Sequence, residues 1–444
     1  MRHLPGKIIL FALFLGIAPT VTSADKQSGK ETGVPVADLI ARLGDRSFRV
    51  RQAAGRALED RGEEALPALR GALNHEDEEI RRRVEVLTEK IERLVLLTPK
   101  RVTIKMKDRP VGDIVAELAK QTGYNLQFQG GGMVRKFSIN LENATYWQAM
   151  DIICNGAGLV PNCDENQGII FLYAQDTVSP YVSQAGAFRL VANNFNYSRN
   201  VNLANIPRGG FDPNNQADNN LNFGFMVQAE PKTPLLSVGV PKLTKAVDEN
   251  DLSLLPRWAD DDEPIRVNYY DGGMYRSFQH NTNAVMAKPA KNATKAKLIQ
   301  GSVTVTILSG TRPEVVVDKL AVGKKKLHGA GESTEIDVEE MTEQNKIYCL
   351  TLTIKKILKI GEQQDFNWIN GVQQKLELAD AKGVKYVSNG INNYISNSPT
   401  MLKAVYQFSP PQKGKVGPPA KLILNQWLTI AHELEFEFKD LPLP

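Results

Sequence analysis

The 444-residue sequence predicts a multidomain α+β protein built from three kinds of folded unit. Helical periodicity fills most of the first hundred residues, a strand–helix pattern then occurs twice, and short alternating stretches make up the remainder. These observations indicate a short helical repeat segment, a compact βαβ–βαββ domain and tandem β-sandwich-like domains. The expected boundaries are 1–24 (signal peptide), 25–34 (flexible leader), 35–98 (helical repeats), 99–175 (α/β domain), 186–320 and 321–444 (two β-sandwich-like domains).

The first residues have the pattern of an export signal. Arg2 and Lys7 precede an apolar run, Ile8–Ala18, and small residues stand at the positions that a cut after Ala24 requires. Eleven helical residues span about 16 Å, roughly half of a bilayer core, so a permanent anchor is the weaker interpretation. We therefore expect an exported protein of the periplasm or cell envelope, or a secreted one, without an integral membrane segment after cleavage.

The charge of the chain is small for its length. The sequence carries 54 basic and 50 acidic residues, a formal charge of +4. Removal of residues 1–24 takes away two basic residues and no acidic ones, leaving 52 − 50 = +2. Because a dedicated nucleic-acid binder needs a concentrated basic face, this balance argues against a nucleic-acid partner.

A helical pattern repeats between Pro35 and Leu94. The apolar residues Leu39, Leu43, Val50, Ala54, Ala57 and Leu58 return thirty residues later as Leu69, Leu73, Ile80, Val84, Leu87 and Thr88. Val50-Arg51 and Ile80-Arg81 hold matching places after polar turns, and this arrangement resembles HEAT-type repeats. Since a solenoid usually needs three or more repeats, the segment either packs against the next domain or is completed by another chain. The charged run Glu76–Arg83 is interpreted as a solvated helix face.

The α/β domain consists of two near-copies of one strand–helix–strand unit, offset by 35 residues. The matching positions include Val102 with Phe137, Ile114 with Ala149, Leu118 with Ile153, and Gly123 with Gly158. A further strand, Ile169–Tyr173, follows. We expect one sheet covered by two helices, with Tyr146 and Trp147 anchoring the second helix against the sheet. An edge strand of so small a sheet could accept a partner strand.

The same stretch resembles the short N-terminal domain of secretins and TonB-dependent transducers. The resemblance rests on Val102–Met106, the helix up to Gly123, Phe137–Leu141 and the second helix from Trp147. It implies a periplasmic interaction module that serves ring assembly or passes a signal to a partner.

After Gln175 short strand-like runs dominate. They include Phe188–Val191, Leu221–Val227, Leu235–Val240, Ile265–Tyr269, Ser302–Leu308, Glu314–Val317, Ile347–Ile354, Leu376–Leu378 and Leu434–Phe438. The stretch Ala246–Leu254 recurs 132 residues later as Leu378–Tyr386, each with an acidic turn between two strands. This recurrence predicts two tandem sandwiches divided near residue 320.

No catalytic, cofactor-binding or metal-ligating residues can be assigned from the sequence. Histidine, serine and glycine spacings match no zinc, hydrolase or nucleotide motif, and His432-Glu433 is explained better as a strand end. Cys154 is interpreted as a small core residue, with a Cys154–Cys163 bridge as the alternative. Weak calcium candidates are the oxygen-rich loops with Asp212, Asn214, Asn215 and Asp218, and with Asp260, Asp261, Asp262 and Glu263. Lys324–Lys326 is interpreted as a hairpin tip.

Three functional hypotheses remain. The preferred one is a non-catalytic exported scaffold or protein-binding protein of the bacterial cell envelope, whose partner is an envelope protein and whose binding residues are unknown. The alternative is a secreted hydrolase or carbohydrate-binding protein that acts through the β-sandwiches, with aromatic side chains on a concave face. The aromatic residues to inspect are Trp258, Tyr269, Tyr270 and Tyr275. A subunit of a secretion ring is a third possibility.

Overall fold

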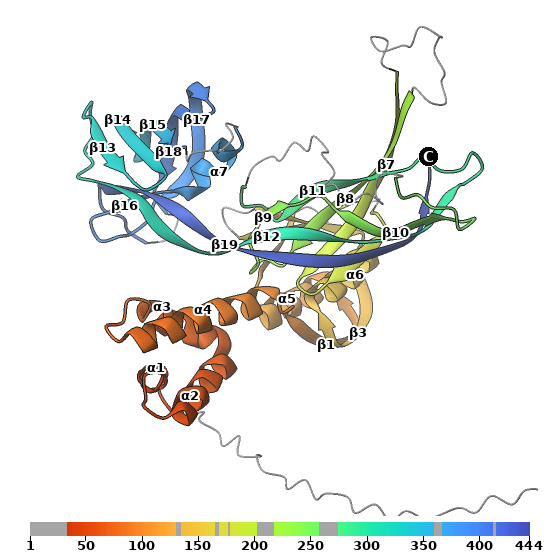
Figure 1. Ribbon diagram of the computed structural model, residues 1–444, viewed down its shortest axis with the longest axis horizontal. Helices are drawn as coiled ribbons and strands as arrows, with labels where there is room; N and C mark the ends of the chain where they lie inside the picture. Colours follow the sequence, from red (N-terminus) through yellow and green to blue (C-terminus); the bar gives the residue numbers. More distant parts are fainter. Residues whose placement is uncertain are drawn as a thin grey trace, which may run out of the picture. The chain divides into compact units, whose positions relative to one another are not determined.

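The computed structural model describes residues 33–129, 135–164, 168–175, 178–201, 217–256, 274–358, 366–411 and 414–444. The predicted signal peptide and nearly all of the predicted leader lie outside these ranges. The chain divides into two compact units, Met1–Ile91 and Glu92–Pro444. Helices at the start and many strands thereafter confirm the α+β class (Figure 1). None of the helices in the described ranges combines the length and apolarity needed to cross a membrane.

Four helices and one 3-10 turn form the helical segment. They are α1 (Val36–Arg42), α2 (Phe48–Arg61), η1 (Gly62–Ala65), α3 (Leu66–Gly71) and α4 (Glu78–Leu97). The thirty-residue repeat is visible in the hydrogen bonds: Arg51 Nη1 donates to the Asp45 carbonyl at 2.7 Å, and Arg81 Nη1 donates to the His75 carbonyl at 2.9 Å. The arginine of each hydrophobe–arginine pair therefore ties the loop to the first turn of the following helix.

The α/β module repeats at an offset of 35 residues. Its elements are β1 (Arg101–Pro110), α5 (Val111–Thr122), β2 (Asn125–Gln129), β3 (Lys136–Thr145), α6 (Tyr146–Ala157), β4 (Leu159–Asp164) and β5 (Ile169–Ala174). Helix α5 ends at Gly123 with φ 76° and α6 at Gly158 with φ 69°, so both copies use the left-handed cap that glycine accepts without strain.

The expectation of one sheet in this module is wrong. Strand β1 pairs with β3 in one two-stranded antiparallel sheet, while β2, β5 and β4 form a second sheet in that order. Strand β2 runs parallel to β5, so the strands of each copy are divided between the two sheets. Both sheets nevertheless contribute to one core with the two helices, including Ile104 from the first sheet and Leu172 from the second.

The rest of the chain forms two β modules, each with its own core. The elements are β6 (Val182–Ala185), β7 (Phe188–Val201), β8 (Ala217–Ala229), β9 (Leu235–Val238), β10 (Lys242–Asp248), β11 (Gln279–Met286), β12 (Lys295–Asp318), β13 (Leu327–Ala330), β14 (Thr334–Gln344), β15 (Ile347–Lys356), α7 (Asn367–Lys375), β16 (Leu376–Asp380), β17 (Val387–Ser398), β18 (Met401–Ser409) and β19 (Pro419–Pro442). The first β module has a sheet of order β11-β8-β7-β6 and the second a sheet of order β13-β14-β15-β18-β17. Each sheet packs on one half of a further sheet that the modules share, of order β10-β12-β19-β16 with β9 also paired to β12.

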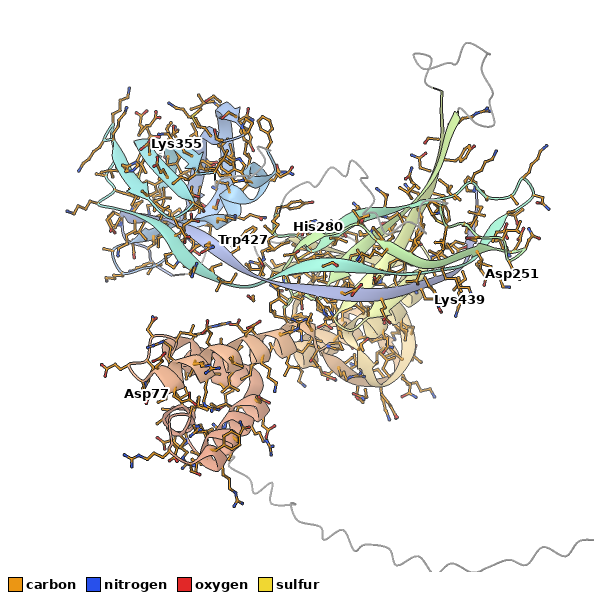
Figure 2. All side chains as sticks on the ribbon, in the orientation of Figure 1. Asp77, Asp251, His280, Lys355, Trp427 and Lys439 are labelled. Atoms are coloured by element: carbon orange, nitrogen blue, oxygen red, sulfur yellow. The ribbon has the colours of Figure 1, made fainter. Side chains whose placement is uncertain are left out.

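The shared sheet is built on a long two-stranded ribbon. Strands β12 and β19 have 24 residues each and pair antiparallel from Lys295↔Pro442 to Asp318↔Lys421 (Figure 1). The start of β12 and the end of β19 fill the first core, whereas the end of β12 and the start of β19 fill the second. Trp427 marks the stretch of β19 between the two cores (Figure 2). Residues 321–444 therefore supply side chains to both cores.

The two β modules have equivalent hydrogen-bonding patterns at one end of their strands. The Glu230 N–H donates to the Ala187 carbonyl at 2.9 Å, and the Ile357 N–H donates to the Ser333 carbonyl at 2.8 Å. The sheet orders also correspond, since β7, β8 and β11 occupy the places that β14, β15 and β18 hold in the second module. The modules are thus two copies of one strand arrangement.

The 132-residue recurrence corresponds to two matching turns. Asp248 Oδ1 accepts hydrogen bonds from the Asn250 and Leu252 N–H groups at 2.8 and 2.9 Å. Asp380 Oδ1 accepts them from the Lys382 and Val384 N–H groups at the same distances. The third residue after each aspartate has a positive φ, 60° at Asp251 (Figure 2) and 82° at Gly383. A buried aspartate therefore organises the same turn in both modules.

These aspartates differ at their second oxygen, which gives a paired prediction. Asp380 Oδ2 accepts the Gly417 N–H at 2.8 Å, whereas Asp248 Oδ2 has no hydrogen-bond partner among the described residues. The backbone donor of Gly417, followed by those of Val384 and Lys382, lowers the pKa of Asp380. We expect Asp380→Asn to lower the thermal unfolding midpoint more than Asp248→Asn, because only at position 380 does the new NH₂ group face a donor. An equal or larger loss at position 248 in calorimetry would contradict this.

Candidate interaction surfaces

One face of the α/β module is already occupied by the first β module. Trp147 is fully buried and its Nε1 donates to the Ala187 carbonyl at 3.2 Å. Its ring lies 5.8 Å from that of Phe278, and the Arg189 guanidinium lies 5.7 Å from its centre. Trp147 was expected to anchor α6 against its own sheet, and it does lie in the core of the α/β module. It also joins this module to the first β module.

The buried Glu230 and the partly buried Asp151 strengthen the same contact. Glu230 accepts the Lys100 N–H at 3.1 Å and the Tyr124 hydroxyl at 2.6 Å. Asp151 lies 2.6 Å from Arg189 Nε and also accepts the Gln184 amide at 2.7 Å. Burial raises the pKa of both carboxyl groups, although the neighbouring donors and cations oppose that effect. This face is a fixed internal contact and is not available to a partner.

The raised pKa of Glu230 predicts a pH dependence. The folded state holds the proton of the Glu230 carboxyl group more tightly than the unfolded chain does. Glu230 therefore stabilises the fold fully below its unfolded-state pKa, and this stabilisation is lost as the pH rises through its folded-state pKa. Glu230→Gln keeps an acceptor oxygen and cannot ionise. We expect the unfolding midpoint of this variant relative to wild type to rise as the pH increases from about 4, the ordinary range of a glutamate, through the raised folded-state pKa. A constant difference across that range would refute the assignment.

The remaining strand edges of the α/β module differ in how open they are. The Gln121 amide occupies the edge of β1, donating to the Thr103 carbonyl and accepting its N–H, both at 2.9 Å. Strand β4 carries Pro161, which has no N–H to offer a new partner. Strand β2 pairs on one side only among the described strands, with β5, and its polar residues Asn125 and Gln127 are exposed. The edge of β2 is therefore the most suitable place for a partner strand.

The edge of the second β module is less suitable. Strand β17 lies at the end of its sheet, and its register with β18 shifts three times along its length. Such irregularities twist an edge and interrupt the row of hydrogen-bonding groups that an added strand would need. Its exposed Tyr394 and Ile395 therefore do not make it a regular docking edge.

A groove lies between α2 and α4 of the helical segment. Its volume is about 370 Å³. It is lined by Leu43, Arg51, Gln52, Gly55, Arg56, Glu59, Glu79, Arg82, Arg83, Val86 and Leu87. The sequence placed Arg82 and Arg83 on a solvated face; the groove was missed because it forms only when the two helices pack together.

A second concavity lies in unit 2, beside the first β module. This pocket of about 490 Å³ combines aromatic side chains of Tyr181, Phe195 and Phe223 with the amides of Asn193 and Asn194. The Phe195 and Phe223 rings lie 5.1 Å apart, and Asn193 donates to Asn281 at 3.0 Å. Aromatic faces beside amides suit a ligand with both apolar and hydroxyl-bearing surfaces.

Of the aromatic residues singled out in the sequence, Tyr275 is described and does not line this pocket. Trp258, Tyr269 and Tyr270 lie outside the described residues. The Tyr275 ring lies 4.6 Å from that of His280. On β19, His432 has its ring 6.2 Å from Phe188, while Glu433 accepts the Ser302 hydroxyl at 2.5 Å. Neighbouring residues of a strand point to opposite faces, so the two do not form an acid–base pair.

The other candidates are placed as follows. Cys154, Cys163 and Cys349 are free thiols, and burial raises the pKa of Cys154 to about 12. Lys324–Lys326 lie exposed in the connection between β12 and β13. The calcium candidates fall outside the described residues, except Asp218, which lies in β8. Within the described ranges no group of three or more potential ligands could hold a metal ion.

Comparison with known proteins agrees with the helical repeats. Residues 32–87 match the family model for HEAT repeats, which confirms the HEAT-like prediction for this part of the chain. No curated protein matches the sequence. The helical segment is therefore similar to HEAT repeats, and this likeness covers residues 32–87 alone.

Proposed function

We propose that the chain is a non-catalytic exported scaffold or protein-binding protein of the bacterial cell envelope. The observation that carries the proposal is the two-repeat HEAT-like segment, which leaves large apolar side chains in solvent: Phe48 is 63% and Val86 is 60% exposed. Because isolated repeats cannot bury a continuous face, such a segment suits completion by another chain.

The α/β module supports the same proposal. Its sequence resembles the short interaction domain of secretins and transducers, and one edge of β2 is not covered by any of the described strands. The export pattern in residues 1–24 supports a location in the periplasm or envelope. An envelope protein that adds a strand to β2, or covers the helical repeats, is the proposed partner.

Site-specific cross-linking tests the proposal more sharply than removal of the module, because deleting residues 101–174 would uncover Ala187 and Phe278. A photo-reactive amino acid is placed at Gln127 on β2, at Val86 on α4, and at the exposed Lys291 as a control. We expect discrete adducts with an envelope protein from position 127 or 86 in intact cells, and none from position 291. Equal, diffuse labelling from all three positions would contradict the proposal.

Carbohydrate binding is the second candidate, and the pocket with Tyr181, Phe195 and Asn194 favours it. Glycan-array binding that is lost in Phe195→Ala would support this function. Absence of any glycan signal would count against it.

A further inference from the structure

We infer that the groove between α2 and α4 binds an acidic peptide segment of a partner protein. This inference rests on the proposed function and specifies the chemistry of the partner at the helical repeats. It starts from the charges that line the groove: the four arginines Arg51, Arg56, Arg82 and Arg83 against Glu59 and Glu79.

Both glutamates already have cationic partners. Glu79 Oε1 lies 2.6 Å from Arg83 Nε and 3.5 Å from Arg51 Nε. Glu59 Oε1 lies 2.7 Å from Lys90 Nζ. The acidic side chains of the groove are therefore neutralised from within the helical segment.

Two guanidinium groups are left over. Arg56 and Arg82 are exposed and have neither an ion pair nor a side-chain hydrogen bond among the described residues. They come from facing helices, α2 and α4, so a ligand in the groove meets a cation on both sides. Arg51 differs from them, because its Nη1 donates to the Asp45 carbonyl and its Nε lies 3.5 Å from Glu79 Oε1. Guanidinium groups pair with carboxylates through two parallel N–H···O bonds.

The groove also offers an apolar contact. Val86 is largely exposed and lies on α4 one helical turn after Arg82, beside the buried Leu87. A ligand that fits this arrangement presents spaced carboxylates with an apolar side chain between them. A continuous phosphate backbone fits less well, because it presents no apolar side chain to the exposed Val86.

A binding measurement with defined probes tests the inference. The purified chain is titrated into fluorescein-labelled Glu-Glu-Leu-Glu-Glu-Leu-Glu-Glu, into the same peptide with Gln or Lys in place of Glu, and into a single-stranded oligonucleotide. We expect only the glutamate peptide to bind, with an affinity that falls as salt is raised from about 50 to about 200 mM.

Matched variants locate the site. Arg56→Gln with Arg82→Gln removes two charges from the groove, and should weaken the glutamate peptide about tenfold. Arg46→Gln with Arg49→Gln removes the same charge from exposed arginines that do not line the groove, and should change affinity less than about twofold. Circular dichroism confirms that both variants keep their helix content.

Three outcomes would overturn the inference: an equal loss of affinity for the glutamate peptide in the two double variants, tighter binding of the oligonucleotide than of this peptide, or no binding of this peptide. The cross-links from Gln127 are a separate measurement of the proposed function. If the peptide fails while those adducts persist, the partner uses β2 and not the groove. If the peptide binds as expected and adducts are absent, the groove inference stands and the envelope partner does not.

Discussion

A chain that ends at Ala431 is expected to lose the fold of the first β module while the second module stays folded. The deletion removes Leu434, Phe436, Phe438 and Leu441, all nearly inaccessible to solvent and all in the first core. Losing these side chains costs on the order of 10–20 kcal/mol. That cost matches or exceeds the total stability of an ordinary domain, about 5–15 kcal/mol.

Hydrogen exchange followed by mass spectrometry distinguishes the two modules. Peptides from β7 and β8 should exchange rapidly in the truncated chain, whereas those from β15 and β18 should keep their protection, because residues 419–431 of β19 remain. Glu433→Ala with Glu435→Ala changes only exposed side chains of the same stretch and serves as the control. Unchanged protection of β7 and β8 after truncation would show that the first core does not need the end of β19.

Replacing Trp147 by alanine is expected to produce the second largest effect. The variant loses a fully buried indole, its hydrogen bond to Ala187, and its contacts with Phe278 and Arg189. Removal of so large a side chain costs about 3–5 kcal/mol. Because Trp147 joins the α/β module to the first β module, the contact between them should loosen before either core unfolds.

Urea unfolding and limited proteolysis measure this effect. Trp147→Ala should shift the unfolding midpoint strongly and open a cleavage site in residues 178–181, between the two modules. Trp147→Phe keeps most of the ring contacts and should lose only about 1 kcal/mol, the value of one hydrogen bond. Similar stabilities for the alanine variant and wild type would contradict the proposed role of the indole.

Local features of the fold were predictable from the sequence. The copies in the α/β module are recognised because their helix ends depend on nearby residues, and Gly123 and Gly158 adopt the caps that glycine favours. The recurrence at Asp248 and Asp380 is recognised for the same reason, since each side chain bonds to the backbone of its own turn. The HEAT-like repeats likewise carry their signal within thirty residues.

Pairing between distant strands was not predictable. The division of the α/β strands into two sheets depends on the pairing of β2 with β5, which lies about forty residues further along the chain. Ser302–Leu308 and Glu314–Val317 were expected to be separate strands, yet β12 contains both. Its register with β19 shifts beside Gly310 and Pro313, which lie between them. The groove between α2 and α4 was not predicted for a related reason: Arg56 and Arg82 belong to different helices and come together only when these helices pack.

The ribbon of β12 and β19 has a consequence for the ancestry of the chain. Apart from β9, which pairs with β12, its sheet has β10 beside β12 and β16 beside β19, so these strands hold equivalent places from the two ends. One module alone would lack the half of β12 or β19 that the other module contributes to its core. It could complete that core only by associating with an identical molecule about a two-fold axis. Gene duplication and fusion would have converted such a homodimer into a single polypeptide, in which neither half can be discarded.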